Sequence, residues 1–90
     1  MQARFPLGQC VVTPGALEIL NQAGIAVLDL LARHAMGDWG DLEEPDRLAN
    51  EQALDLGDRL LSNYRFDGGR CWIITEADRS VTTILLPEEY

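Results

Sequence analysis

The 90-residue chain contains no lysine, a single histidine and only two cysteines, and its seven basic residues are all arginine. Fifteen acidic residues give it a net charge of −8. Because nonspecific nucleic-acid binding requires neutralisation of phosphates, this charge argues against direct nucleic-acid binding. It favours a basic protein partner instead, for example a host protein that itself binds nucleic acid.

Several kinds of segment are also missing. The longest apolar stretch, residues 25–31, is interrupted by Asp29 and is too short to cross a bilayer, so no membrane association is expected. The start of the chain has no apolar segment of the secretory type, which favours a cytoplasmic location. Cys10 and Cys71 match no metal-ligand spacing and are expected to be buried free thiols in apolar strands. With no glycine-rich phosphate loop and no nucleophile elbow, the sequence predicts neither a metal nor a cofactor.

Helical periodicity occupies the first half of the chain. Thr13-Pro14 is typical of a helix start and Gly24 of a helix end, which predicts a helix over residues 14–23. The nearly all-apolar segment that follows predicts a central, buried helix over residues 25–36.

A third helix is expected to begin near Asp41, which has capping-box spacing with Glu44, and to run to about Leu61. Apolar residues recur along one side of this segment at the helical period. Gly57 falls within that apolar stripe, where we expect it to mark a close approach to another element rather than the end of the helix.

The period changes after the third helix, where Asp67-Gly68-Gly69 is typical of a hairpin turn. The expected strands are short and rich in branched or aromatic residues, and they cover residues 64–66, 70–75 and 80–86, with a further candidate at residues 8–12. Residues 1–90 are therefore predicted to form a single α+β domain. Three N-terminal helices would pack on a small antiparallel sheet of three strands, or four if the first candidate joins it.

The stretch of residues 33–42 holds the only histidine and an Asp-Trp pair between two glycines. His34 is the one side chain that normally titrates near neutrality, so it is a candidate general acid or base; alternatively it closes a helix and pairs with Asp38. Trp39 is either a recognition aromatic or a side chain that folds back into a small core. Asp38, Trp39 and Asp41 are accordingly candidate binding residues for a partner.

A second candidate surface is an apolar sheet face. Both faces of the two C-terminal strands are partly apolar, so the face that packs on no helix would expose a patch. The residues assigned to this patch are Trp72, Ile74, Ile84 and Leu86. Such a patch would bind a protein partner or form a homodimer, unless the N-terminal arm covers it through Phe5 and Leu7.

A third cluster surrounds the last turn. Arg79 with Thr82 and Thr83 has the chemistry of a phosphate site, since arginine offers a fork of donors and each hydroxyl can donate. The alternative is that Arg79 pairs with Glu76 or Asp78 within the turn itself.

The segment Trp72–Tyr90 (WIITEADRSVTTILLPEEY), with Arg33-His34 and the segment Gly37–Leu42 (GDWGDL), resembles short bacterial proteins of plasmids, phages and integrative elements that are often called plasmid-related proteins. The resemblance spans nearly the whole chain. It implies a mobile-element setting and specifies no activity. The first hypothesis is therefore an accessory or regulatory protein that binds a protein partner; its binding residues would be Asp38, Trp39, Asp41 and Trp72.

A weaker resemblance is to the barnase-, EndoU- and RelE-like ribonucleases, which place helices before an antiparallel sheet and cleave RNA through its 2′-hydroxyl. It implies an alternative hypothesis, a small metal-independent ribonuclease. His34 would be its acid or base, Arg79 its phosphate ligand, and Thr82 or Thr83 an auxiliary donor. The ribonuclease requires His34 and Arg79 in one open cleft, whereas a buried His34 with an exposed Trp72 or Trp39 favours the binding protein.

Overall fold

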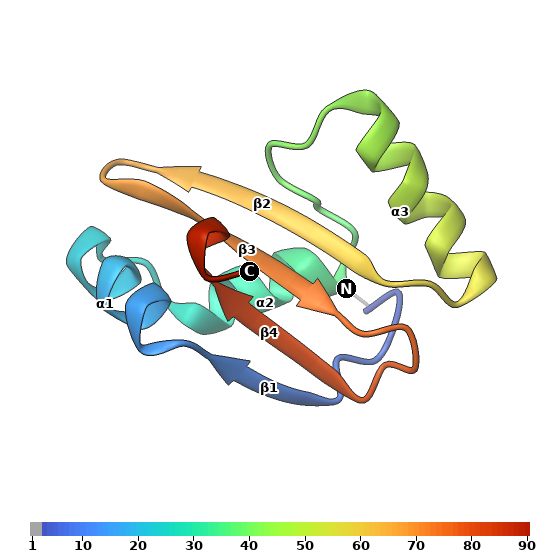
Figure 1. Ribbon diagram of the computed structural model, residues 1–90, viewed down its shortest axis with the longest axis horizontal. Helices are drawn as coiled ribbons and strands as arrows, with labels where there is room; N and C mark the ends of the chain where they lie inside the picture. The colour runs from blue at the N-terminus through green and yellow to red at the C-terminus, as the bar shows by residue number, and fades with distance from the viewer. Residues whose placement is uncertain (1–2) are drawn as a thin grey trace.

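A strand, rather than a helix, comes first in the chain. The computed structural model describes residues 3–90 and shows three helices and four strands (Figure 1). In chain order the elements are β1 (Gln9–Val12), α1 (Pro14–Ala23), α2 (Val27–Ala35), α3 (Glu44–Leu56), β2 (Leu60–Phe66), β3 (Gly69–Thr75), β4 (Val81–Leu85) and the 3₁₀ helix η1 (Pro87–Glu89). The predicted α+β class is confirmed, but the helices do not all precede the sheet.

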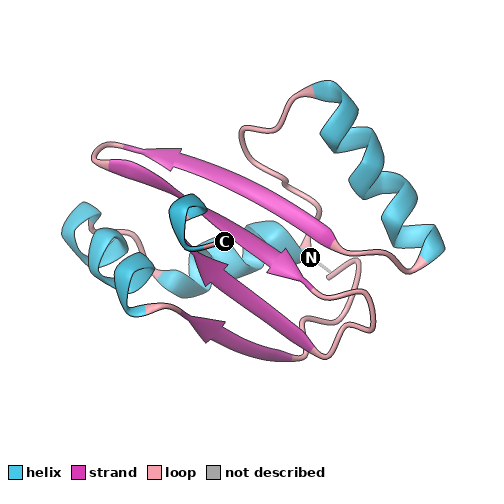
Figure 2. Ribbon diagram, viewed as in Figure 1, coloured by secondary structure: helices cyan, strands magenta, loops and turns pink. Residues whose placement is uncertain are grey.

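The sheet has four strands in the order β1-β4-β3-β2 and is mixed, not antiparallel as predicted. β2, β3 and β4 pair antiparallel through two turns, whereas β1 runs parallel to β4 (Figure 2). The arm before β1 passes close to the turn before β4. Gly8 lies at this point, with a φ of 66°, and a Cβ atom there would collide with the carbonyl oxygen of Ser80, so the approach requires glycine. Sequence periodicity does not reveal this pairing, since it joins the two ends of the chain.

The ends of α1 agree with the prediction. The Thr13 hydroxyl accepts a hydrogen bond from the N–H of Ala16 at 3.1 Å, and Gly24 ends the helix with a φ of 71°. Helix α2 lies within the predicted range but is shorter at both ends. Within the part of the chain that the structure describes, no single helix is long and apolar enough to cross a membrane; α1 and α2 together reach the length and composition but are bent by 104°.

The end of α3 corrects the prediction. The helix stops at Leu56, and Gly57 is its left-handed C-cap with a φ of 76°. No atom lies within 4 Å of the position that a Cβ of Gly57 would occupy, so this glycine marks a helix end and not a close approach. Leu60 and Leu61 continue the apolar stripe of the helix in the sequence, which explains the error, but they belong to β2.

The core lies on one face of the sheet, against α1 and α2 (Figure 1). Its least exposed large side chains come from both layers and include Leu20, Leu30, Tyr64, Ile73 and Ile84. A second cluster, formed by Phe5, Trp39, Ala53 and Leu60, joins α3 and the N-terminal arm to the same side of the sheet. Because Phe5 belongs to this cluster, the arm packs on the core side and does not cover the opposite face.

The two cysteines differ in burial. Cys71 is fully buried in the core, as predicted, but Cys10 is exposed, because β1 lies at an edge of the sheet. Both are free thiols.

The pairing register decides which residues share the outer face of the sheet, the face opposite α1 and α2. Trp72 pairs with Leu85, and Ile73 pairs with Ile84. Ile84 therefore points into the core, with 1% of its surface exposed, and does not share a patch with Trp72 as predicted. Leu86 also belongs to the core cluster, and Ile74, although on the outer face, is only 5% exposed. Of the four residues of the predicted exposed patch, only Trp72 is partly exposed.

The free edge of β2 is closed by the chain itself. The Asn50 side-chain amide accepts from the N–H of Leu61 at 3.1 Å and donates to its carbonyl at 2.6 Å. Asn63 lies two residues further along the strand. Its N–H donates to the Trp39 carbonyl at 3.1 Å, and the Asn63 carbonyl accepts from the N–H of Asp41 at 2.6 Å. This edge therefore offers few free backbone groups to another chain.

The segment before α3 makes this closure possible. Gly40 has a φ of 75°, and a Cβ atom there would collide with the carbonyl oxygen of Asn63. The Asp41 carboxylate accepts from the N–H of Arg65 at 2.9 Å. Asp41 thus caps the sheet edge and not α3 as predicted; the N-cap of α3 is Glu43, which forms no side-chain capping bond.

Gly40→Ala and Gly57→Ala form a matched pair, because their φ values are 75° and 76° but only Gly40 has backbone in the way of a methyl group. Gly57→Ala is expected to lower the free energy of unfolding by about 1 kcal/mol, the cost of the left-handed conformation alone. Gly40→Ala should cost at least about 2 kcal/mol more, since β2 and the loop must move apart. Urea unfolding measures both; equal losses would contradict the required close approach.

Candidate functional site

The outer face of the sheet is the surface on which side chains from several strands lie side by side in the open. Within residues 3–90, α1 and α2 lie behind the sheet (Figure 1). On the outer face lie η1 and the C-terminal residue, and the loop before α3 with the start of α3 borders this face beside β2. Two adjoining hollows lie on it, toward β2 and β3.

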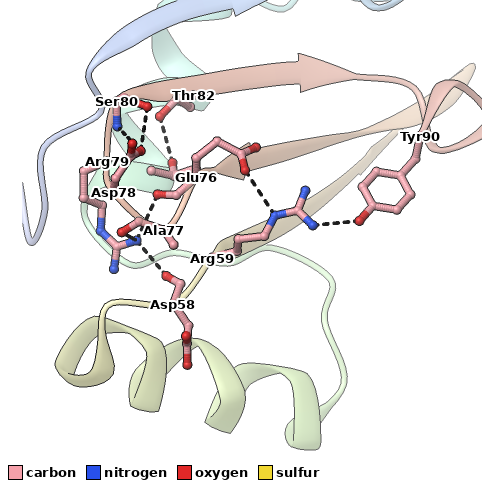
Figure 3. A network of polar contacts seen from close by, with 10 residues as sticks. Asp58, Arg59, Glu76, Ala77, Asp78, Arg79, Ser80, Thr82 and Tyr90 are labelled. Carbon is pink, nitrogen blue, oxygen red and sulfur yellow. Dashed lines mark hydrogen bonds and ion pairs between the residues drawn. The ribbon is translucent and has the colours of Figure 1, made fainter.

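The first hollow is apolar and has a volume of about 260 Å³. Its lining consists of Arg59, Leu60, Leu61, Trp72, Ile74 and Tyr90. Tyr90 meets Trp72 edge to face, with the ring centroids 5.7 Å apart. Arg59 fixes this arrangement, because its guanidinium donates to the Tyr90 hydroxyl at 2.8 Å and lies 3.5 Å from the Glu76 carboxylate (Figure 3). The result is a small aromatic pocket with a polar rim.

The second hollow has a volume of about 360 Å³ and shares Leu61 and Trp72 with the first. Its remaining lining is mostly charged, with three carboxylates from the start of α3 and the loop before it, and two guanidinium groups from the β2–β3 hairpin. These residues are Asp41, Glu43, Asp46, Arg65 and Arg70. We call the two hollows together the Trp72 groove. It offers apolar contact on one side of Trp72 and charge on the other.

Asn63 lines the charged hollow and has an unusual amide. Its side-chain oxygen is buried and has no hydrogen-bond partner within residues 3–90. Buried acceptors without a partner are rare in folded proteins.

Two of the four residues predicted to bind a partner, Asp41 and Trp72, come together in the Trp72 groove. Trp39 does not, because it is only 5% exposed, stacks on Phe5 and donates from Nε1 to Glu51 at 2.9 Å. It fills the core, in agreement with the alternative interpretation.

Asp38 is engaged within the chain. Its carboxylate accepts from the guanidinium of Arg33 at 2.7 Å and from the N–H of Gly40 at 3.2 Å. The Arg33 guanidinium holds the pKa of this carboxyl below its ordinary value. Asp38 therefore supports the loop. The pairing of His34 with Asp38 that the sequence suggests does not form, because Asp38 is paired with Arg33.

His34 is fully buried and bonded to the two strands beside it. Its Nδ1 lies 2.6 Å from the Ser62 hydroxyl and its Nε2 lies 2.9 Å from the Thr75 hydroxyl. Thr75 contacts the Thr82 hydroxyl at 2.8 Å, and Thr82 donates to the carbonyl of Leu7 at 2.7 Å. All four side chains have no exposed surface. A continuous chain of hydrogen bonds thus runs from β2 through α2 and across β3 and β4 to the N-terminal arm.

The direction of this chain follows from its last member. A carbonyl oxygen only accepts, so the single hydroxyl proton of Thr82 goes to Leu7, and Thr82 must accept from Thr75. Thr75 then accepts from Nε2–H of His34, and Nδ1 accepts from Ser62. The geometry assigns the neutral Nε2–H tautomer. Burial lowers the pKa of His34 from 6.5 to about 4, in agreement with a neutral ring.

The Arg79 guanidinium is bound by backbone carbonyl groups (Figure 3). The acceptors are Asp58, Glu76, Ala77 and Ala53, at 2.6, 3.2, 3.2 and 3.1 Å. Two of these carbonyls lie at or just beyond the C-terminal end of α3, where a cation is favoured by the helix dipole. Arg79 therefore ties α3 to the β3–β4 turn. It uses backbone oxygens there, in place of the carboxylates expected from the sequence.

The residues assigned to the ribonuclease hypothesis do not meet in an open cleft. His34 and Thr82 are fully buried, and both terminal nitrogens of the Arg79 guanidinium donate to backbone carbonyls. Thr83 points to the outer face, away from Thr82, as the alternation of a strand requires. A phosphodiester would reach His34 only if the core opened. Within residues 3–90, no three metal-ligating side chains lie close enough to hold a metal ion.

Most residues of the groove were missed by the sequence analysis, among them Arg59, Leu61 and Tyr90 of the apolar hollow and the charged residues of the other hollow. Arg59 and Leu61 fall within the predicted third helix, and Tyr90 lies beyond the last predicted strand. Recognising Gly57 as the end of that helix places Leu61 on a strand, where it shares the outer face with Ile74. No sequence signal brings Tyr90 onto Trp72, because η1 makes that turn.

Comparison with known proteins identifies no relative, since no family model, curated protein or solved structure matches the chain significantly.

The stability of the protein is expected to fall in mild acid because of His34. Its pKa is near 4 in the folded state and 6.5 in the unfolded state, so the unfolded chain binds more protons between these values. The contribution of neutral His34 to the free energy of unfolding is complete above pH 6.5. It decreases by about 3 kcal/mol as the pH falls to 4. Urea unfolding at a series of pH values measures this loss.

His34→Gln is the control, because an amide carries no proton change and the carboxylates titrate alike in both proteins. The variant should be less stable at neutral pH, and its stability should vary less between pH 6.5 and 4. Parallel pH profiles for the two proteins would contradict the assignment. Nitrogen NMR of the imidazole should also show Nδ1 unprotonated and Nε2 protonated.

Proposed function

We propose that this chain is a small accessory or regulatory protein of bacterial mobile elements, and that it acts by binding a protein partner at the Trp72 groove. The supporting observation is a half-buried tryptophan at the junction of an apolar and a charged hollow, on the sheet face opposite α1 and α2. Tryptophan in a central pocket often supplies much of the energy of a protein interface. Open apolar hollows rimmed by polar groups mark such interfaces on small domains.

The groove favours a partner with two features. Its apolar hollow suits one large aliphatic or aromatic side chain. Its charged hollow has three carboxylates for two guanidinium groups, so it suits arginine or lysine next to that anchor. The net charge of −8 adds long-range attraction for a basic protein, such as one that binds nucleic acid.

The mobile-element setting rests on the resemblance of residues 72–90 and 37–42 to plasmid-related proteins. Five of the residues in these segments line the Trp72 groove: Asp41, Leu42, Trp72, Ile74 and Tyr90. The resemblance and the groove thus involve the same part of the fold. A cytoplasmic location belongs to the same proposal, since basic nucleic-acid-binding partners act there.

Trp72→Ala is expected to weaken binding of a basic, aromatic peptide at least tenfold, because a central tryptophan contributes about 2 kcal/mol to such contacts. The probe is a short synthetic peptide with one phenylalanine flanked by arginines. Titration followed by NMR should shift the signals of Leu61, Trp72 and Tyr90. An otherwise identical peptide with glutamates in place of the arginines should bind far more weakly.

The matched control is Leu28→Ala, which removes a side chain that is 77% exposed on α2 and should leave binding unchanged. Equal affinity for both peptides, or shifts that map away from the groove, would count against the proposal. RNA cleavage in EDTA by the wild type but not by His34→Ala would support the ribonuclease instead.

A further inference from the structure

The two edges of the sheet, β1 and β2, differ in whether other parts of the protein bond their outward backbone groups. Along β2, the outward backbone groups of Leu61, Asn63 and Arg65 are bonded by Asn50 and by residues 39–41. Along β1, no such cover exists within residues 3–90: the strand packs mainly on β4, and nothing lies beyond it (Figure 1). The asymmetry makes β1 the edge at which another strand can add.

The free groups of β1 can be identified from its pairing. The N–H of Gln9 donates to the carbonyl of Ser80, just before β4, at 2.9 Å, and the N–H of Thr13 donates to the carbonyl of Ile84 in β4 at 3.0 Å. Backbone groups alternate along a strand, so Val11 also faces β4, whereas Cys10 and Val12 face outward. Within residues 3–90 the N–H and carbonyl groups of Cys10 and Val12 form no backbone hydrogen bond outside the sheet, and the alternation points them away from β4, the one neighbour of β1 in the sheet.

The edge also lacks the usual protection. Its four residues carry no charge and include no proline, and the pairing with β4 is continuous, without a bulge. Three of the four are exposed, and Val11 has 41% of its surface accessible on the outer face. The shortness of the strand is its one protective feature, and it limits the strength of any association.

We propose that β1 pairs with β1 of a second copy of this chain, antiparallel and about a twofold axis through Val11, to form a continuous eight-stranded sheet. In this register Cys10 faces Val12 of the other copy, and all outward groups are bonded, in four hydrogen bonds. Val11 faces Val11. Any other twofold register leaves some of these backbone groups unpaired. The β1 edge of one copy is therefore complementary to the β1 edge of a second copy.

A second copy is a better occupant than a foreign basic strand. The proposed partner of the Trp72 groove is selected by charge, but Gln9–Val12 has no charge to offer it. Self-pairing brings uncharged edges together and holds the acidic surfaces apart. The predicted homodimer is thereby moved from the sheet face to the β1 edge, which leaves the groove free.

The association is expected to be weak and reversible. A pair of four-residue strands buries less surface than the roughly 1,200 Å² at which stable interfaces begin. The apparent mass of the wild type should therefore rise with concentration, over about a hundredfold range. Val11→Lys should abolish this rise, since like charges would face each other across the axis.

Disulfide trapping tests the register directly. Cys10→Ser/Val11→Cys places two thiols opposite each other with Cα atoms about 4.5 Å apart, which suits a disulfide. In the wild type the two Cys10 residues are diagonal neighbours about 7–8 Å apart, too far for a disulfide. Cys10→Ser/Leu28→Cys, with the thiol exposed on α2, reports random collisions. Cys71 is buried and is kept in all three proteins.

Under mild oxidation, Cys10→Ser/Val11→Cys is expected to form at least about tenfold more disulfide dimer than either of the other proteins. Equal trapping at positions 11 and 28 would overturn the proposal, as would efficient trapping through Cys10. If the double variant is unfolded, the light-scattering comparison of wild type and Val11→Lys decides, and a concentration-independent monomer mass for the wild type overturns the proposal. Neither result affects peptide binding at Trp72, so the two proposals fail separately.

Discussion

The buried hydrogen-bond chain through His34 is the constraint on which the rest of the structure depends. An unpaired polar group in the core costs about 1–3 kcal/mol. This protein buries four such groups side by side, the imidazole of His34 and the hydroxyls of Ser62, Thr75 and Thr82. Each group has a partner only if the arm, α2 and three strands keep their relative positions. A shift of one residue between β3 and β4 would turn Thr82 to the outer face and break the chain at Thr75. The single histidine therefore specifies the register of the sheet.

Residues 37–41 are unusual in sequence for a related reason. The stretch must leave α2, supply Trp39 to the core and lie against β2 closely enough for backbone hydrogen bonds. Gly40 permits that approach, and Asp41 closes the next position of the edge. Its composition is therefore largely explained by support of the edge strand. Asp41 also lines the Trp72 groove on the neighbouring face, where we propose that a partner binds.

Sequence reasoning was most successful where the determinants are local. The caps of α1, the hairpin at Asp67-Gly68-Gly69 and the burial of Cys71 follow from short patterns, and Trp72 was singled out from an apolar strand. It failed where a pattern continues across a boundary or joins distant segments. The apolar stripe of α3 runs past Gly57 into β2, and the parallel β1–β4 pair has no local signature. Half of the predicted binding residues reach the groove, because Trp39 and Asp38 serve the core and the loop.

Two surfaces of the sheet remain free for a partner, because neither the helices of the core nor residues 39–41 cover them. Helices cover the inner face, and residues 39–41 with Asn50 close the β2 edge, which leaves the outer face and β1. A twofold axis at an antiparallel pair of edge strands runs perpendicular to the sheet, so both Trp72 grooves would lie on the same face of the dimer. A shallow groove and a four-residue edge are each weak contacts. A partner with two basic segments would engage both grooves at once, and the second contact would then be intramolecular, which raises the effective affinity without any new contact.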